Sequence, residues 1–506
     1  MRHAILAASL ALATACATAR PIETGQPAEA LPPAPRVRTV GAPTPEDEAR
    51  AVRARDEAAR HLTQQAERLW RLWVGLEPPA EAEPADHLFE PETVRAVERV
   101  AAHAEAPRTW RRLYAFLAAE FLDRAVRDED EALAEARLRA LAYRPEGGAE
   151  EARGDAIAEA LEPLLPLVEA RNAALRRALG ALAYESPFEA AVHLAGMEGE
   201  EAIHLAESIL RATDGLWEEA FFGAAQRTLG RDATELGWSD LPRVLRSAGL
   251  DVPLRRRRPR ETLDATLARL ELDLSAVDRL QIDADPREDR EARSLCLPMP
   301  GGARLALPED GGPRHGDLFR DVGCALVAAR GGNVPPEPVL RAFGGLFARL
   351  TAQVAWLTEV GGMTGAEARA RGAALGLRRL FLVRHHAALL LAEAERGKGQ
   401  AAYERAYARH MARAFGIRVP GAVARLERTT PLEAVDLLRG ELLASMLAEA
   451  MGEAWWNDPA SRQRLDLLLD AGVEGIDALI TALGREALEV GPFVTELRAA
   501  LAPPEV

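Results

Sequence analysis

A short stretch, DLFRDVGCALVA from Asp317 to Ala328, places three side chains at a spacing used in metal chemistry. Arg320 and Cys324 are four residues apart, so a helix puts both on one face, and Asp321 directly follows the first of them. Two histidines at this spacing bind zinc, and a glutamate after the first serves as the general base. Here an arginine, an aspartate and a cysteine occupy those positions.

The neighbouring residues predict the elements that hold this stretch. Apolar side chains recur at helical spacing on the side away from Arg320 and Cys324: Leu318, Phe319, Val322, Ala325 and Leu326. Short strand-like runs precede the helix at 277–283, 294–298 and 303–307, separated by Pro, Gly and Asp turns. The stretch alone favours an ordinary amphipathic helix, but a small sheet before it is a more specific arrangement, in which an edge strand can bind an extended peptide.

These segments together resemble the catalytic segment of the oligopeptidase F and thimet oligopeptidase group of zinc peptidases. The resemblance is carried by LDLSAV from Leu272, LQIDADPREDREARSLCLPMPGGARLALPEDGG from Leu280, and DLFRDVGCALV from Asp317. Gly323 stands at the glycine of the His-Glu-x-Gly-His motif, and Cys296 stands in the cysteine-bearing strand. The resemblance implies a large helical zincin-like fold with a small sheet beside the active-site helix.

The resemblance continues toward the carboxy-terminus and covers residues 238–456 in outline. VLRAFGGLF from Val339 is similar to the second motif of the group, whose glutamate is the third zinc ligand, and Arg341 occupies that position after a trimmed loop. Trp356-Leu357, the helix at 377–395 and the helices from Leu438 to Trp456 also resemble family segments.

The residues at the mapped positions predict a degenerate site with no metal, no cofactor and no catalytic residue. Arg320 and Arg341 carry guanidinium groups, which stay protonated and cannot donate to a metal ion. Cys324 alone is not a zinc site, and Asp321 has no activated water to act on. We expect Asp321 or a nearby acid to pair with one of the arginines and to replace the metal as a cross-link between helices.

Other residue patterns give weaker signals. His385 and His386 are adjacent and point in different directions on a helix, so they cannot jointly bind one ion, and Glu393 is too far along the helix to help. His315 and His410 have no partner at ligand spacing. No phosphate-binding glycine loop and no Gly-x-Ser-x-Gly nucleophile motif occurs in the sequence.

The amino-terminus resembles a bacterial lipoprotein signal. A short basic start and an apolar run lead to Leu12-Ala-Thr-Ala-Cys16, which is similar to a lipobox. Cleavage before Cys16 would remove residues 1–15, and Cys16 would then carry lipid. The alternative is an ordinary signal peptide cut near Ala15 or Ala17. Residues 16–46 are rich in Pro, Ala and Thr and predict a disordered tether. Ala17 favours the outer over the inner membrane of a cell envelope.

Composition limits the remaining possibilities. Net charge is −15, which argues against a nucleic-acid partner. The basic run Arg255–Arg258 is either a local patch or a solvated hinge loop. Besides Cys16, the chain has only Cys296 and Cys324, which could pair or remain as buried free thiols.

Helix-forming residues dominate the body of the chain, so the predicted fold class is mainly α. We expect a helical lobe at 47–250 and a degenerate peptidase-like lobe at 251–506. Aromatic residues at helical spacing are expected to be core: Trp70, Trp73, Trp110, Tyr114 and Phe121.

Three functions remain open from the sequence. The first is an inactive, lipid-anchored peptidase relative that binds a peptide or protein in its cleft. The second is an active peptidase with a rebuilt site, which zinc content and hydrolysis assays would distinguish. The third is a structural helical envelope protein without a ligand, for which a filled core would stand where the cleft is expected.

Overall fold

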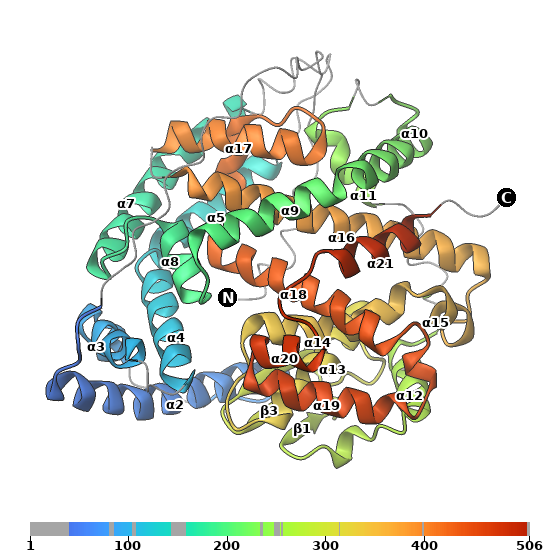
Figure 1. The fold of residues 1–506 in the computed structure, drawn as a ribbon, viewed down its shortest axis with the longest axis horizontal. Helices are drawn as coiled ribbons and strands as arrows, with labels where there is room; N and C mark the ends of the chain where they lie inside the picture. The colour runs from blue at the N-terminus through green and yellow to red at the C-terminus, as the bar shows by residue number, and fades with distance from the viewer. Residues whose placement is uncertain are drawn as a thin grey trace. The chain divides into compact units, whose positions relative to one another are not determined.

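The chain is mainly α-helical with one small sheet, as the sequence predicts (Figure 1). None of the helices in the described part of the chain is both long and apolar enough to span a membrane. The predicted signal segment and Cys16 lie outside that part. The computed structural model describes residues 40–79, 85–103, 108–142, 158–232, 236–246, 254, 257–312, 314–396 and 399–502.

The described residues form two compact units, each assembled from three segments of the chain. Unit 1 takes residues 40–54, 86–248 and 377–435, and unit 2 takes residues 55–85, 249–376 and 436–502. Three long helices, α2 (Pro45–Trp73), α16 (Gly365–Ala394) and α18 (Pro431–Met451), contribute residues to both. The boundary near residue 250, expected between a helical lobe and a peptidase-like lobe, stays a prediction.

Unit 1 is built from helices alone among its described elements. Besides its parts of the shared helices it contains α3 (Pro91–Ala102), α4 (Arg108–Arg124), α5 (Arg127–Ala142), α7 (Leu165–Ala181), α8 (Pro187–Leu194), α9 (Gly199–Trp217), α10 (Gly223–Leu229), α11 (Leu241–Arg246) and α17 (Gln400–Phe415). Helix α8 starts as its sequence predicts, because the Ser186 hydroxyl accepts the Glu189 N–H at 3.1 Å.

Aromatic side chains fill the interior of unit 1. The Trp217 ring stacks on Phe221 at 4.6 Å between centroids, and its indole N–H donates to the Phe415 carbonyl at 2.9 Å. Tyr114 of α4 is buried as predicted, whereas Trp110 and Phe121 are half-buried. The prediction of a core position therefore holds for Tyr114 and not for Trp110 and Phe121.

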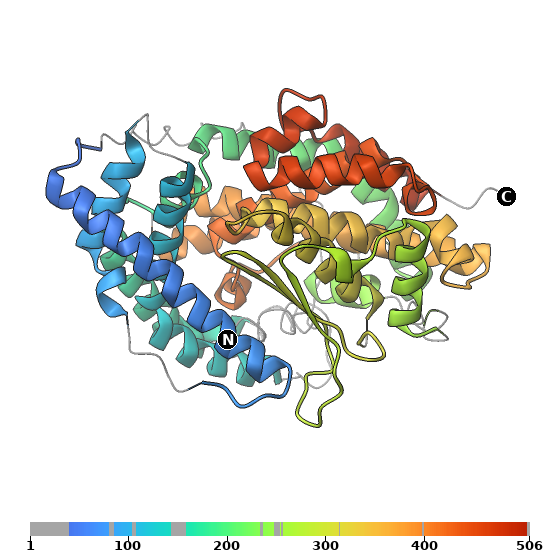
Figure 2. The ribbon, with the colours of Figure 1, turned by 90° about the horizontal axis from the view of Figure 1, so that it is seen from below.

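Unit 2 contains the sheet and the helices around it. Besides its parts of the shared helices it comprises α12 (Pro259–Arg269), β1 (Leu280–Asp283), β2 (Leu295–Met299), β3 (Gly302–Ala306), α13 (His315–Arg330), α14 (Glu337–Arg349), α15 (Val354–Glu359), α19 (Ser461–Glu474), α20 (Ile476–Ala482) and α21 (Gly491–Leu501). All three strands lie within or beside the predicted runs. Figure 2 shows them, in yellow-green, beside the gold helices α13 and α14.

The sheet has the order β1-β3-β2, so β2 is an edge strand. Strand β3 pairs parallel with β1 and antiparallel with β2, with Cys296 opposite Leu305. The β2–β3 connection is the short turn around Pro300 and Gly301, and Gly301 has φ +89°, which a glycine adopts without strain.

The two faces of the sheet contact different helices. Alternate residues point to opposite faces of a strand, and the side chains of Ile282, Cys296 and Leu305 belong to the apolar cluster around α13. On the other face, Ala306 packs in a second cluster with Trp70 and Trp73 of α2. The Trp73 indole N–H also donates to the Arg293 carbonyl at 2.9 Å. Helix α2 therefore covers the face that α13 does not.

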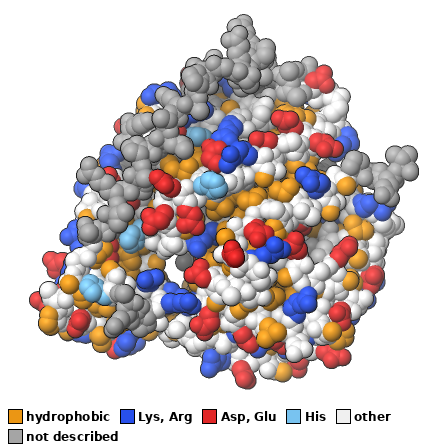
Figure 3. Space-filling view, viewed as in Figure 1, with side chains coloured by type: hydrophobic (Ala, Val, Ile, Leu, Met, Phe, Trp, Pro, Cys, Tyr) orange, Lys and Arg blue, Asp and Glu red, His pale blue; other side chains and the backbone are white. Residues whose placement is uncertain are grey.

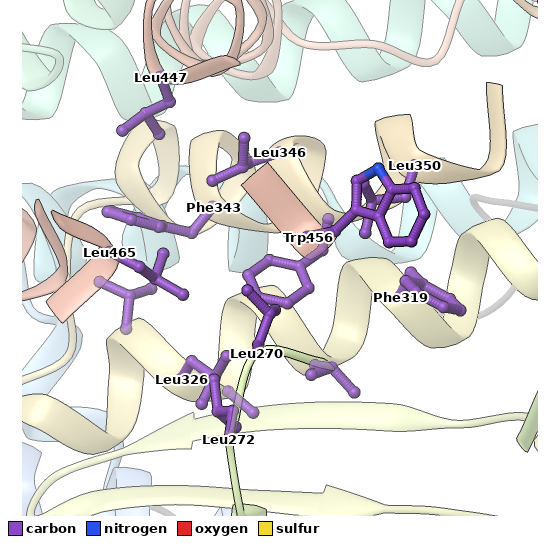
Figure 4. Packing of buried hydrophobic residues seen from close by; sticks show 14 of the residues in the cluster. Leu270, Leu272, Phe319, Leu326, Phe343, Leu346, Leu350, Leu447, Trp456 and Leu465 are labelled. Atoms are coloured by element: carbon purple, nitrogen blue, oxygen red, sulfur yellow. The ribbon is translucent and has the colours of Figure 1, made fainter. Parts of the chain in front are cut away.

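The main core of unit 2 lies between α13 and α14 and over the sheet. Figure 4 shows Phe319 and Leu326 of α13 with Phe343 and Leu346 of α14. Phe319, Phe343 and Leu346 are fully buried. This packing fixes the backbone of the helix that carries the candidate site residues.

Charged side chains are interspersed over the outside of the described residues. On the face drawn in Figure 3, acidic and basic side chains alternate and do not gather by sign. Many are ion-paired within one helix turn, as in Arg462 with Asp466 at 2.8 Å. Exposed pairs of this kind add little stability each.

Candidate functional site

Helix α13 has the amphipathic character predicted for it and begins two residues earlier than expected, at His315. The predicted apolar stripe is buried: Leu318, Phe319, Val322, Ala325 and Leu326. Arg320 is exposed on the opposite side, while Asp321 and Cys324 are half-buried beside the sheet. The sequence pattern therefore predicted the buried stripe and the exposed position of Arg320, whereas Cys324 packs against the apolar cluster.

Arg320 lies at the outer end of the contact between α13 and α14. Its guanidinium pairs with Asp317 at 3.0 Å, one turn back on the same helix. Its aliphatic stem covers Gly344 of α14, where an added Cβ would lie 2.9 Å from the Arg320 Cγ. Arg320 thus contacts the neighbouring helix through its stem and uses its charge on its own helix.

Asp321 is held against the segment that leads into β2. Its carboxylate accepts a hydrogen bond from the Ser294 hydroxyl at 2.5 Å. Burial raises the pKa of Asp321 to about 6, although the Ser294 hydroxyl and the Arg320 charge both act to lower it. The sequence did not predict the hydrogen bond between Ser294 and Asp321, because the spacing of residues 294 and 321 does not indicate it.

The two cysteines come together as free thiols. Cys324 lies one turn after Asp321 on α13, and Cys296 lies in β2, which packs on that helix. Neither cysteine is joined in a disulfide, and Cys324 is among the groups that act on the Cys296 thiol. Burial and the neighbouring Cys324 raise the pKa of the Cys296 thiol. Of the two possibilities left open by the sequence, the structure has the free pair.

Arg341 lies on α14, where it pairs with Glu337 of the same helix at 3.0 Å between Nε and Oε1. Its Cβ rests against Gly440 of α18, where an added Cβ would be only 2.6 Å away.

A nearby acid pairs with each arginine, as expected, but the expected ionic cross-link between helices is wrong. Arg320 and Arg341 each pair with a carboxylate of their own helix, and Asp321 is bonded to Ser294. An arginine reaches an acid one turn away on its own helix at little entropic cost. The pair within one helix therefore forms in place of a pair between two helices. Apolar packing, with close contacts at Gly323 and Gly344, joins α13 to α14.

The side chains at the mapped positions do not fit a zinc ion. Of the four mapped residues, two are guanidinium groups, one is a carboxylate engaged by a hydroxyl, and one is a thiol beside a second thiol. Throughout the described ranges, His, Cys, Asp and Glu side chains nowhere gather in a group of three that could hold a metal ion. No reaction step is therefore assigned to a metal here.

His385, His386 and His410 have structural contacts. His385 Nε2 pairs with Glu427 at 3.1 Å, and His386 Nδ1 lies 2.7 Å from the Leu382 carbonyl. Their rings meet at 89°, in keeping with different directions on α16. His410 Nε2 lies 2.9 Å from Glu395. Arg257 and Arg258 of the basic run precede α12, and Arg255 and Arg256 lie outside the described residues.

Comparison with other proteins gives distant structural likenesses only. No protein-family model matches the chain, and no curated protein matches it in sequence. A protein described as oligoendopeptidase F, from Bacillus anthracis str. Ames, aligns with TM-score 0.43 and 11% identity, over 82% of this chain and 84% of that one. A second protein described as oligoendopeptidase F aligns with TM-score 0.44 and 13% identity, over the same shares. PZ peptidase A with an inhibitor aligns with TM-score 0.46 and 9% identity, over 92% of this chain and 98% of that one.

Proposed function

We propose that this chain is a catalytically inactive relative of the zinc oligopeptidases that binds a peptide or protein without cleaving it. The observation that carries the proposal is the presence of guanidinium groups, Arg320 and Arg341, at two of the three positions where the sequence resemblance requires a metal donor. A guanidinium offers only N–H donors and a permanent positive charge, so it repels a cation.

The binding part of the proposal is supported by the sheet. Strand β2 is at the edge of the sheet and is half-buried along its length, and Pro298 lies within it. Proline is tolerated in edge strands because it lacks a backbone donor. An edge strand leaves backbone groups that an added extended peptide can pair with.

A second candidate is a structural protein without a ligand, and one observation favours it. The contact between α13 and α14 is filled, because the Gly323 backbone lies against the Phe343 carbonyl and the surrounding phenylalanines are fully buried. This alternative expects a filled core where a cleft lined by Arg320, Asp321, Cys324 and Arg341 would otherwise lie, and the close contact between the helices supports it. The two candidates differ in whether β2 responds to peptides.

The catalytic half of the proposal is tested by metal content and hydrolysis together. Protein purified without chelator is analysed for zinc and incubated with internally quenched peptides, with and without added zinc. We expect far less than one zinc per chain and no chelator-sensitive cleavage. One tightly bound zinc per chain with hydrolysis that a chelator abolishes would support the active-peptidase alternative instead.

The binding half is tested by hydrogen exchange across the sheet in the presence of a peptide pool. We expect slower amide exchange in β2 (295–299), with no change in β1 (280–283), the opposite edge, which serves as an internal control. Equal exchange in β2 with and without peptides would favour the structural candidate.

We also propose that Cys16 carries lipid and that the chain is attached to a bacterial envelope, at the outer membrane. The support is the lipobox-like Leu12–Cys16 and the tether-like composition that follows it. Labelling of producing cells with a clickable fatty acid should mark the wild-type chain and leave Cys16→Ser unmarked. Equal labelling of both would overturn the assignment, and cleavage at Ala15 or Ala17 would support an ordinary signal peptide.

A further inference from the structure

Two thiols from different elements meet where the sheet packs on α13. Cys296 belongs to edge strand β2, and Cys324 to the middle of the helix. Both side chains pack against the same apolar cluster of unit 2. Neither is joined in a disulfide, and strand β2 packs directly on α13.

Neighbouring contacts fix the relative position of the two thiols. Asp321, one helical turn before Cys324, accepts the Ser294 hydroxyl at 2.5 Å, and Ser294 lies two residues before Cys296. On its other side, Cys296 pairs in antiparallel register with Leu305 of β3. A cysteine side chain is short, so strand and helix held in this way keep the sulfur atoms near each other.

We infer that Cys296 and Cys324 form a redox-active dithiol site that reacts with low-molecular-weight disulfides and closes to an intramolecular disulfide between β2 and α13. Neither the resemblance to peptidases nor the proposed binding of a peptide enters this inference. It assigns a covalent chemistry to a face where no metal site fits.

The exchange proceeds in two balanced steps. The Cys324 thiolate attacks one sulfur of the oxidant, breaks its S–S bond and expels one thiolate, which leaves a mixed disulfide on Cys324. Cys296 then loses its proton to solvent and attacks the Cys324 sulfur, which releases the second thiolate. Two protein thiols and one oxidant disulfide thus become one protein disulfide and two small thiols.

The surroundings set the order of the two steps. Burial, the hydrogen bond with Cys324 and the nearby Asp321 charge all raise the pKa of the Cys296 thiol, so it is seldom ionised at neutral pH. Cys296 is therefore suited to the second step, in which the sulfur it attacks is already beside it.

The test uses the full chain with Cys16→Ser, so that only this pair can react. The folded protein is incubated with oxidised glutathione, and its intact mass and non-reduced peptide map are measured. We expect the loss of two hydrogen atoms, no retained glutathione and one cross-linked peptide pair containing residues 296 and 324. Stable glutathione adducts on both cysteines, or reaction only in denaturant, would overturn the inference.

Matched serine variants test the order of attack. Cys296→Ser should trap a stable glutathione adduct on Cys324, and Cys324→Ser should form its adduct on Cys296 several-fold more slowly, because burial keeps the Cys296 thiol protonated. Equal rates in the two variants would contradict the order. The cross-link in the parent protein decides the inference even if one variant folds poorly.

Discussion

Gly323 of α13 and Phe343 of α14 approach each other backbone to backbone. A Cβ built on Gly323 would lie 2.3 Å from the Phe343 carbonyl oxygen. That oxygen belongs to the backbone, so it cannot turn away as the end of a side chain could. The glycine that the sequence resemblance assigns to a catalytic motif therefore also has a packing role, which holds whether or not the site is active.

The first prediction follows from this contact. Gly323→Ala should destabilise the protein by about 2–4 kcal/mol, because the helices must separate to admit the methyl group. Urea denaturation measures the change. Gly180→Ala is the matched control: Gly180 lies inside α7 with no atom within 4 Å of an added Cβ. It should be stabilising by about 0.5–1 kcal/mol, because alanine favours a helix. Equal effects in the two variants would contradict this account.

The second prediction concerns Asp321, whose pKa is raised from 3.8 to about 6. An acid with a raised folded-state pKa stabilises the fold only while it is protonated, so this contribution is present below pH 3.8 and lost as the pH rises through 6. Asp321→Asn keeps the shape and stays neutral. The free energy of unfolding of the variant relative to wild type should therefore increase between pH 4 and pH 7, by on the order of 2 kcal/mol.

Ser294→Ala provides the opposite change at the same contact. The serine hydroxyl favours the charged carboxylate, so its removal should raise the Asp321 pKa further and cost about 1–3 kcal/mol at pH 7. Thermal or urea denaturation at pH 4 and pH 7 separates the two effects. A Ser294→Ala variant with the same pH dependence as wild type would show that the hydroxyl does not act on Asp321.

The third prediction concerns the buried carboxylate of Glu427 in unit 1. It pairs with His385 at 3.1 Å and accepts the amide N–H groups of Arg428 and Thr429 at 3.0 Å each. Burial alone would raise the pKa of Glu427, but His385 and these donors outweigh it and lower the pKa well below 4.5. A lowered pKa gives stability that is present above pH 4.5 and lost as the pH falls toward the folded-state value.

Glu427→Gln should therefore cost about 3–5 kcal/mol at pH 7 and less in acid. Urea denaturation across this pH range measures the loss. Glu486→Gln, at an exposed position, is the control and should change stability by less than about 0.5 kcal/mol. A constant penalty at all pH values would mean that the charge of Glu427 contributes nothing.

Local patterns predicted the elements around the site well. The apolar spacing in 317–328 indicated both the helix and its buried side, and the Pro-Gly turns bracketed the three strands. Helix α8 also begins at a local signal, because Ser186 and Pro187 mark its start. Signals of this kind lie within a few residues of the feature they specify.

Contacts between distant residues could not be predicted in the same way. The Ser294–Asp321 bond and the approach of Cys296 to Cys324 depend on how the sheet lies on α13, which no spacing encodes. The ionic link between helices was expected from residue types alone, and it failed because each arginine has an acid one turn away. The charge of a side chain indicates that it needs a partner of opposite charge. It does not indicate which of several nearby acids or bases that partner will be.

The covering of the sheet by α2 has a consequence for synthesis of the chain. Trp73 donates to Arg293, 220 residues later, so the indole leaves the ribosome about 20 s before its acceptor at ~10 residues per second. Until then Trp70 and Trp73 lack the strands they will shield. A nascent polypeptide halted near residue 250 would present these rings to chaperones, because the sheet that they pack against is still to be made.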